Sequence, residues 1–394
     1  MFFFDLGLST YFFLFNLFLV GHGFTEKTLG FLASAFGVGC LAGAIPAGRL
    51  VRQLGLRPVL LLSLLVATVS AIARATLLAS AFQVIFAFVA GLSIAAWGVC
   101  IAPVVAQLAD EHQRPKVFSL VFSLGIGVGA LGALASSRLP GWFANQHVHR
   151  FQPDQLVLIL SSCVVAVGIW PAARLKFIRH TEVVPQARKV LSPFLWLFLP
   201  AIAAWSLVTG SFSPFANVYF SRHIHMSLPQ IGNAFACSQL IQVAAVLVAP
   251  WIFKRCGLVG SIVFTQLSAS VLLLILAMVG HPFAASAGYV AFSAFQWMNE
   301  PGIYSLLMNM VPDQERGSAA ALNSFVMSSS QAIAALIAGQ AFARFGYPAS
   351  LCAIAVVALF AALLFLRMRA ASTPVTRPLA SLDADSTQPG NHLA

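Results

Sequence analysis

Charged residues are scarce in this chain. Of its 394 residues, 8% are charged and 59% are hydrophobic. Soluble domains carry about 25% charged and about 45–50% apolar residues. No soluble core could hide this much apolar surface. The scarcity of charge therefore excludes an ordinary soluble domain and predicts a protein whose solvent is lipid.

Several motifs are also missing. The 6 cysteines form no Cys-x-x-Cys pair, so we expect neither a disulfide nor a metal site. No glycine-rich phosphate loop with its lysine is present, so ATP is not the expected energy source. No His-Glu-x-x-His or Gly-x-Ser-x-Gly motif occurs, and we expect no enzyme and no cofactor. The net charge of +11 comes from basic residues in short loops between apolar runs, which argues against a nucleic-acid partner.

Long apolar runs fill most of the chain. A membrane-spanning helix needs about 20 mostly apolar residues. Twelve stretches meet this length, and they predict an all-α membrane protein. The first six are 1–21, 29–48, 58–78, 82–107, 117–138 and 155–174. The second six are 193–220, 230–252, 257–280, 283–310, 318–342 and 348–367.

The basic residues predict the orientation of these spans. Most of the 22 lysines and arginines fall in loops on one side. The smaller group assigned to the other side is Lys27, Arg74, Arg138, Arg150, Arg222 and Arg344. Cytoplasmic loops carry the excess of positive charge. We therefore expect both termini in the cytoplasm of a multi-pass protein of the bacterial inner membrane.

The apolar stretches form two similar halves. A duplicated hydrophobic half is typical of transporters, with the substrate path between the halves. The repeat also predicts that the first span begins upstream of Met1. The domains expected are an N-terminal six-helix bundle (1–175), a central cytoplasmic loop (176–192), a C-terminal six-helix bundle (193–368) and a disordered cytoplasmic tail (369–394). The repeat places these residues at equivalent positions of the two halves, and we call each pair an echo: Gly55 with Gly257, Arg114 with Arg316, Glu111 with Asp313, and Asn16 with Asn217.

The loop between the second and third stretches carries a family pattern. Transporters of the major facilitator superfamily have Gly-x-Leu-x-Asp-Arg-x-Gly-Arg-Lys at this place, and Gly48, Gly55 and Arg57 fit it. The chain resembles that superfamily. The resemblance implies two six-helix bundles that rock around a central site, with this loop controlling the conformation. Arg52 stands where the family has its acid, which leaves open whether gating is impaired.

Asp5 and Glu300 are the acids that fall inside apolar stretches. Charges within a membrane are costly, and they usually face the bundle interior or a water-filled path. Gln296, Glu300 and Tyr304 share one helical face by their spacing of four. An acid at such a place suits proton uptake and release, so Asp5 and Glu300 are candidates for proton coupling or substrate binding. The alternative is a structural, hydrogen-bonded acid.

Other polar and aromatic residues in the spans are candidates to line a cavity. An aromatic lining would suit an apolar or cationic organic solute. Packing is the alternative for the tryptophans, where we favour it, and for the two equivalent asparagines, where the two roles are evenly balanced. The candidates are Asn16, Trp97, Trp205, Asn217, Gln296, Trp297, Asn299 and Tyr304.

We expect a secondary transporter that moves a small organic solute by alternating access. Coupling to protons is expected, and export is favoured over uptake. A proton-coupled nutrient importer is one alternative, and a non-transporting sensor or lipid-handling protein is another. The expected partners are the solute, protons and the lipid bilayer, with the protein a monomer.

Overall fold

The computed structural model describes the chain except residues 109–113, 147–151, 176–192, 313–314 and 372–394. Side chains at 102–103, 105–123 and 369–371 are also not described. The expected central loop, most of the expected tail, and the echo of Glu111 with Asp313 fall outside the described residues. All regular secondary structure in the described part is helical, which confirms the all-α prediction.

The first half of the chain forms seven helices. Two of them, α6 and α7, are separated only by Gly168 and together cover one expected span. The helices are α1 (Phe2–Gly21), α2 (Glu26–Leu54), α3 (Leu56–Thr76), α4 (Ser80–Leu108), α5 (Arg114–Asn145), α6 (Pro153–Val167) and α7 (Ile169–Arg174).

In the second half, α8, η1 and α9 together follow the expected span 193–220. Pro214 lies in the short 3-10 helix η1 that interrupts it, because proline cannot supply a backbone donor. The elements are α8 (Pro193–Phe212), η1 (Ser213–Phe215), α9 (Ala216–Arg222), α10 (Leu228–Cys256), α11 (Leu258–Met278), α12 (Pro282–Met310) and α13 (Arg316–Ala371).

Glycines mark the sharpest turns between helices. Gly55 links α2 to α3 with φ +91°, and Gly257 links α10 to α11 with φ +72°. Residues with a Cβ rarely adopt such a backbone. The expected break between the last two spans falls at Gly346, which has non-helical φ 74° and ψ 177° inside α13. We call the end of the molecule that holds Glu26 the Glu26 end, and the opposite one the Gly55 end.

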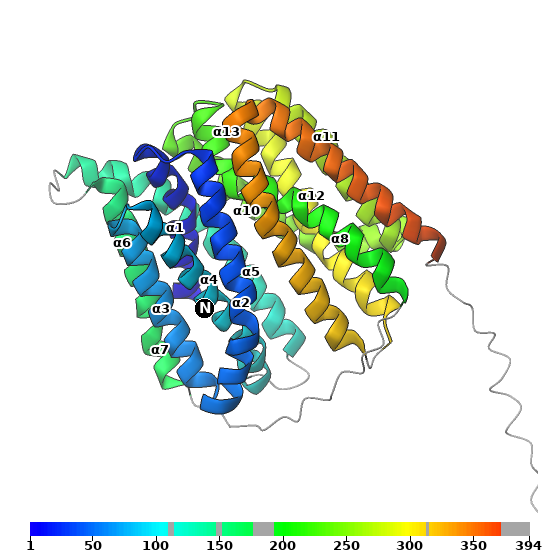
Figure 1. The fold of residues 1–394 in the computed structure, drawn as a ribbon, viewed down its shortest axis with the longest axis horizontal. Coiled ribbons are helices and arrows are strands. Elements are labelled where there is room, and N and C mark those ends of the chain that lie inside the picture. The colour runs from blue at the N-terminus through cyan, green and yellow to red at the C-terminus, as the bar shows by residue number, and fades with distance from the viewer. Residues whose placement is uncertain (109–113, 147–151, 176–192, 313–314, 372–394) are drawn as a thin grey trace, which may run out of the picture.

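The helices pack as two sets. In Figure 1, α1 to α7 lie together, coloured from blue through cyan to bluish green, and α8 to α13 lie together in green to red-orange. The sets meet where α2 contacts α13, where α5 contacts α10 and where α1 contacts α9. Figure 1 also shows α2 and the first part of α13 close together at one end and diverging toward the other. The space between the sets is therefore the first place to search for a site.

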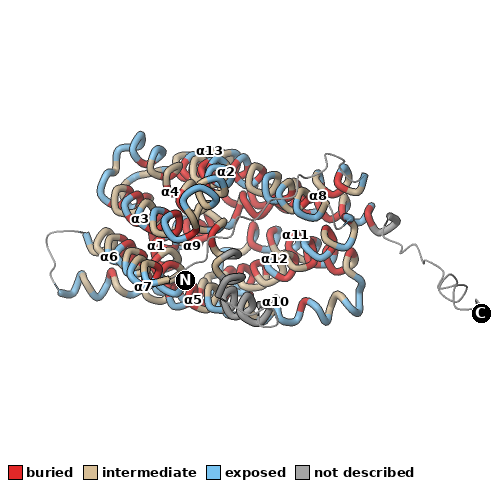
Figure 2. The backbone as a smooth tube through the Cα atoms, turned by 90° about the horizontal axis from the view of Figure 1, so that it is seen from below, coloured by how far each residue is buried: buried red, intermediate tan, exposed pale blue. Residues whose placement is uncertain are grey.

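The outer faces of both sets are apolar and exposed. Figure 2 shows buried residues along the inside of the helices and exposed ones outside. Met278 is 86% exposed and Leu247 is 72% exposed, which suits contact with lipid rather than water. Within the described residues, 9 helical segments are long and apolar enough to cross a membrane. The helices α5 and α12 follow predicted stretches but are not among them, and α13 covers two predicted spans.

Candidate functional site

A cavity of about 550 Å³ lies between the two sets of helices. It is lined by α1, α2, α3 and α5 from the first set, and by α8 to α10, α12 and α13 from the second. Its size is typical of sites for small molecules, about 300–1,000 Å³. The duplicated halves therefore place a pocket for a small solute along their shared boundary.

The lining combines aromatic, amide and hydroxyl groups. Among the residues that form this wall, Arg74 is the one with a formal charge. The aromatic members are Phe12, Phe13, Phe15, Phe36 and Phe235. The amide and hydroxyl members are Ser9, Asn16, Thr209, Ser213, Asn217, Gln239, Gln296, Ser328 and Gln331. Such a wall can bury an apolar body and bind several polar groups at once.

Two asparagines tie the halves together beside the cavity. Asn16 Nδ2 donates to the carbonyl of Pro214 at 2.7 Å, and Asn217 Nδ2 donates to the carbonyl of Phe13 at 2.8 Å. The two bonds are reciprocal, because each asparagine bonds the carbonyl three residues before the other one. Asn217 Oδ1 also accepts the Val218 N–H at 2.9 Å, which fixes its amide. The echo seen in the sequence thus corresponds to a pair of equivalent contacts.

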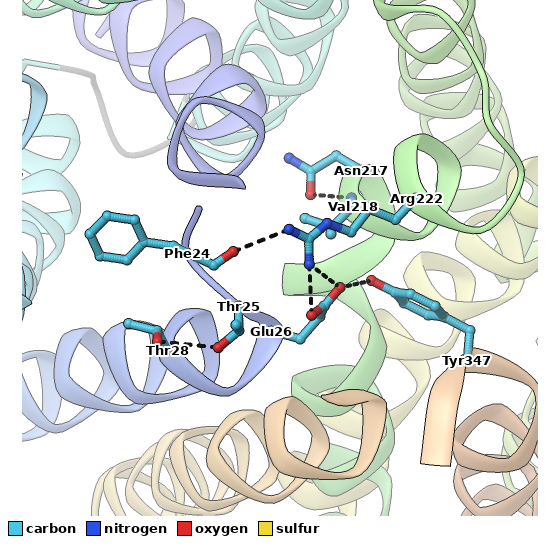
Figure 3. A network of polar contacts seen from close by, with 8 residues as sticks. All are labelled: Phe24, Thr25, Glu26, Thr28, Asn217, Val218, Arg222 and Tyr347. Atoms are coloured by element: carbon cyan, nitrogen blue, oxygen red, sulfur yellow. Dashed lines mark hydrogen bonds and ion pairs between the residues drawn. The ribbon is translucent and has the colours of Figure 1, made fainter. Parts of the chain in front are cut away.

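An ion pair closes the space between the halves at the Glu26 end. Arg222 Nη1 donates to both carboxylate oxygens of Glu26 at 2.9 Å, and Nη2 donates to the Phe24 carbonyl at 3.3 Å (Figure 3). Tyr347 donates from its hydroxyl to Glu26 Oε1 at 3.3 Å. The Glu26 side chain is 10% exposed and that of Arg222 is 36% exposed. One residue of the first half therefore holds α9 and α13 of the second.

His223 follows this ion pair in the chain and stacks near Tyr219 and Tyr347, with ring centroids 5.4 and 5.7 Å apart. Burial, and then the neighbouring His225, lower the pKa of His223 below its ordinary value of 6.5. Its ring is therefore neutral at pH 7, so it does not repel Arg222.

Small residues allow close helix contacts just below the ion pair. A Cβ built on Gly30 would lie 2.6 Å from the Ala335 carbonyl oxygen and 3.0 Å from Gly339 Cα. At the equivalent place in the other pair of helices, a Cβ on Gly232 would collide with Ser137 and lie 3.0 Å from the carbonyl oxygen of Ala133. Each crossing brings two backbones together, as small residues do between membrane helices. The repeat therefore sets both inter-half crossings.

Three residues predicted from the sequence line the cavity, namely Asn16, Asn217 and Gln296. Gln296 Oε1 accepts a hydrogen bond from the Ser213 hydroxyl at 3.4 Å. Glu300 and Tyr304 follow Gln296 on the same face of α12, one and two turns closer to the Gly55 end. They are not among the residues that line the cavity wall; Glu300 is half-buried and Tyr304 is 42% exposed.

The other candidates lie against helices away from the cavity wall. Asp5 faces α5, where a Cβ on Gly125 would be 3.6 Å from its Oδ2, and that oxygen has no hydrogen-bond partner among the described residues. Trp97 stacks on Phe4 with ring centroids 4.1 Å apart. Trp205 is fully buried in the hydrophobic core.

Two candidates on α12 also lie outside the wall. Trp297 is 40% exposed. Asn299 is fully buried and accepts a hydrogen bond from Thr265 at 3.2 Å, within the second set of helices.

The predicted loop motif lies at the Gly55 end. Gly48 and Arg52 belong to the last turns of α2, and the Arg52 side chain is exposed. Arg57 donates from Nη2 to the carbonyl of Ala173 in α7, so it fastens α3 to another helix of its own half. Gly55 provides the turn between these two arginines.

Sequence reasoning missed Arg74, Glu26 and the partners of Glu26. Arg74 was grouped with the loop cations, although it falls inside the predicted span 58–78; it is 5% exposed in α3, which corrects that assignment. Arg222 was predicted for the same loop side as Lys27, which follows Glu26 in the chain. The opposite charges of Glu26 and Arg222 flank equivalent connections, between α1 and α2 and between α9 and α10, and they were the available signal for an ion pair.

Comparisons with known proteins complete the description. The model of the Major Facilitator Superfamily matches residues 1–219 and again 198–389. The chain is similar in structure to the nucleoside transporter NupG, with TM-score 0.70, 12% sequence identity and coverage of 93% of this chain and 99% of that one. A point mutant of NupG gives TM-score 0.73 at 12% identity, covering 93% and 97% of the two chains. No curated protein matches this sequence.

Proposed function

This chain belongs to the major facilitator superfamily, and on that premise we propose that it moves a small organic solute across a membrane by alternating access. It is an integral, multi-pass membrane protein and a secondary transporter by family. The observation that carries the proposal is the cavity of about 550 Å³ built from both halves. A site at the boundary of two repeats can be exposed to each side in turn when the halves rock.

We further propose twelve spans, counting α6 with α7, α8 with α9, and the parts of α13 before and after Gly346. The Gly55 end then lies in the cytoplasm with both termini, in a bacterial inner membrane, and a monomer suffices for transport. In this orientation the ion pair of Glu26 and Arg222 is an outer gate in its closed state. The cavity then faces the cytoplasm.

Glu300 is our first candidate for proton coupling, and Asp5 is the second. The position of Glu300 supports this role, because Glu300 shares the face of α12 that presents Gln296 to the cavity. A carboxyl at that position can exchange a proton with the cytoplasmic side while the solute site is open. We propose export as the direction, and proton-coupled uptake of a nutrient is the alternative.

Both similar structures are of a nucleoside transporter, so uridine and adenosine belong among the solutes to test. A sensor or lipid-handling protein without transport is the other alternative. A flux assay in proteoliposomes separates these possibilities. If no solute that stabilises the purified protein crosses the membrane, the transport proposal fails.

The coupling proposal predicts a split between two kinds of flux in the Glu300→Gln variant. Glutamine is close in size to glutamate but cannot release a proton, so movement driven by a pH gradient is expected to fall to background. Counterflow, in which labelled solute exchanges for unlabelled solute, needs no net proton movement and is expected to persist.

The matched control is Asp154→Asn, which neutralises an acid in the first turn of α6. It is expected to leave both fluxes intact. The direction of the pH gradient that drives solute movement decides between export and uptake. Gradient-driven flux that survives in Glu300→Gln would remove Glu300 from the coupling mechanism.

A further inference from the structure

Arg74 is an unusual residue to find in the wall of an otherwise uncharged cavity. It lies in the last turn of α3, and its side chain is 5% exposed. Its guanidinium carbon stands 4.2 Å from the centroid of the Phe15 ring. Arg74 and Phe15 both line the cavity. The contact with Phe15 holds the guanidinium against the wall of the cavity between the two halves.

This cation has no counter-charge among the residues that the structure describes. Its Nε is buried without a hydrogen-bond partner. The ion pair found among the described residues joins Arg222 to Glu26 and does not include Arg74. Within the described ranges, no acidic residue contributes to the cavity wall. The nearby Tyr11 hydroxyl donates instead to the carbonyl of Ala71 at 3.0 Å.

A buried charge is costly to maintain unless it is paired and hydrogen-bonded. A cation–π contact with Phe15 compensates part of that cost. The guanidinium still has donors to offer, and its planar fork matches the two oxygens of a carboxylate. An anion entering the cavity would therefore supply the partner that the protein itself does not provide.

The rest of the wall indicates what kind of anion fits. Phe12, Phe13, Phe36 and Phe235 offer apolar and aromatic contact, while Asn16 and Gln296 offer amides. A single positive charge suits one negative charge. We propose that this cavity binds a small organic monocarboxylate with an apolar or aromatic body, and that Arg74 pairs with its carboxylate. This rests on the proposed function only in taking the cavity as the solute site.

The charge preference differs from the expectation drawn from tryptophans, which favoured an apolar or cationic solute. Those tryptophans do not line the cavity, whereas Arg74 does. The charge of Arg74 also distinguishes this cavity from one built for an uncharged nucleoside, because a nucleoside would leave Arg74 without an ionic partner.

The test measures binding by purified protein in lipid nanodiscs with three probes of similar shape. Phenylacetate carries a negative charge, phenylacetamide is neutral and phenethylammonium is positive. Benzoate with benzamide and butanoate with butanamide extend the comparison to other bodies, and inorganic phosphate tests whether a free anion suffices. Calorimetry or thermal shift gives the affinity. At least one carboxylate is expected to bind about tenfold or more tightly than its amide, as a hydrogen-bonded charge pair should.

The Arg74→Gln variant is expected to lose this preference, and Arg74→Lys to keep part of it. The matched control is Arg174→Gln, which removes an exposed arginine stacked over Trp170 at 4.0 Å and is expected to bind as the wild type does. Gel filtration checks that each variant is folded; if Arg74→Gln is not, the weaker binding of carboxylates to Arg74→Lys decides.

Several outcomes overturn the proposal. These are amides that bind as well as every carboxylate, a preference that survives in Arg74→Gln, and phosphate that binds as tightly as the carboxylates. Flux in proteoliposomes separates this failure from that of the proposed function. Carboxylates that bind through Arg74 but never cross the membrane would contradict the proposed transport and support the proposed binding site. Carboxylates that cross equally well in Arg74→Gln would contradict the binding site and leave transport supported.

Discussion

Asn16 and Asn217 hold the two halves together through hydrogen bonds to each other's helices. Each bond is between a side-chain amide and a backbone carbonyl of the other half. The sequence identified the pair by its position in the repeat but left packing and cavity roles balanced. The structure places both residues in the cavity wall and gives both a partner across the boundary. Side chains that serve packing and lining together cannot be separated by sequence pattern alone.

At the residue scale we predict that Asn16→Ala and Asn217→Ala each destabilise the closed arrangement by roughly 1 kcal/mol, the net value of a typical hydrogen bond. Thermal unfolding in nanodiscs measures the effect. The control is Asn233→Ala, because Asn233 accepts a hydrogen bond from Arg138 across the same boundary at an exposed site. Asn233→Ala is expected to lower the stability by less than either variant of the asparagine pair. Equal melting temperatures for all three variants and the wild type would contradict the role of the asparagine pair.

At the scale of elements, two helix crossings define how the halves meet. The crossing of α2 with α13 is built on Gly30 and Gly339, and the crossing of α5 with α10 is built on Ser137 and Gly232. The apolar runs predicted the helices because spans must be long and apolar in lipid. They did not predict the crossings, because close backbone contact depends on which faces meet.

We predict that Gly30→Ala weakens the crossing of α2 with α13. The added Cβ would lie 2.6 Å from the Ala335 carbonyl oxygen, so the helices must separate. The expected result is faster reaction of the cavity residue Cys40 with a maleimide from the Glu26 end. Gly98→Ala is the control, since a Cβ there meets nothing within 4 Å. Unchanged labelling in Gly30→Ala would show that this contact does not hold the halves together.

At the scale of the whole molecule, two halves are joined at the Glu26 end around a cavity. The repeat and the apolar spans allowed this architecture to be predicted from sequence. The ion pair of Glu26 and Arg222 and the buried cation Arg74 could not be predicted from the sequence. All three residues resembled ordinary charges near the ends of spans. The burial of Glu26 and Arg74, and the partners that Glu26 and Arg222 have in space, distinguish these residues from solvated ones.

The most direct test of alternating access is the sidedness of Cys40 labelling. Cys40 lines the cavity, so it serves as a reporter in a variant whose other cysteines are alanine. In vesicles with one protein orientation, an impermeant maleimide is expected to reach Cys40 from the Gly55 end and poorly from the Glu26 end. Arg222→Gln breaks the ion pair and leaves Glu26 largely buried without its cation, which favours opening.

We predict that Arg222→Gln raises labelling from the Glu26 end by about tenfold, equivalent to roughly 1.4 kcal/mol in the balance between states. Arg344→Gln, which removes an exposed arginine near the same end, is expected to leave it unchanged. Cys40 that reacts equally from both ends in the wild type, or a rate from the Glu26 end that Arg222→Gln does not change, would contradict a gated cavity between two moving halves.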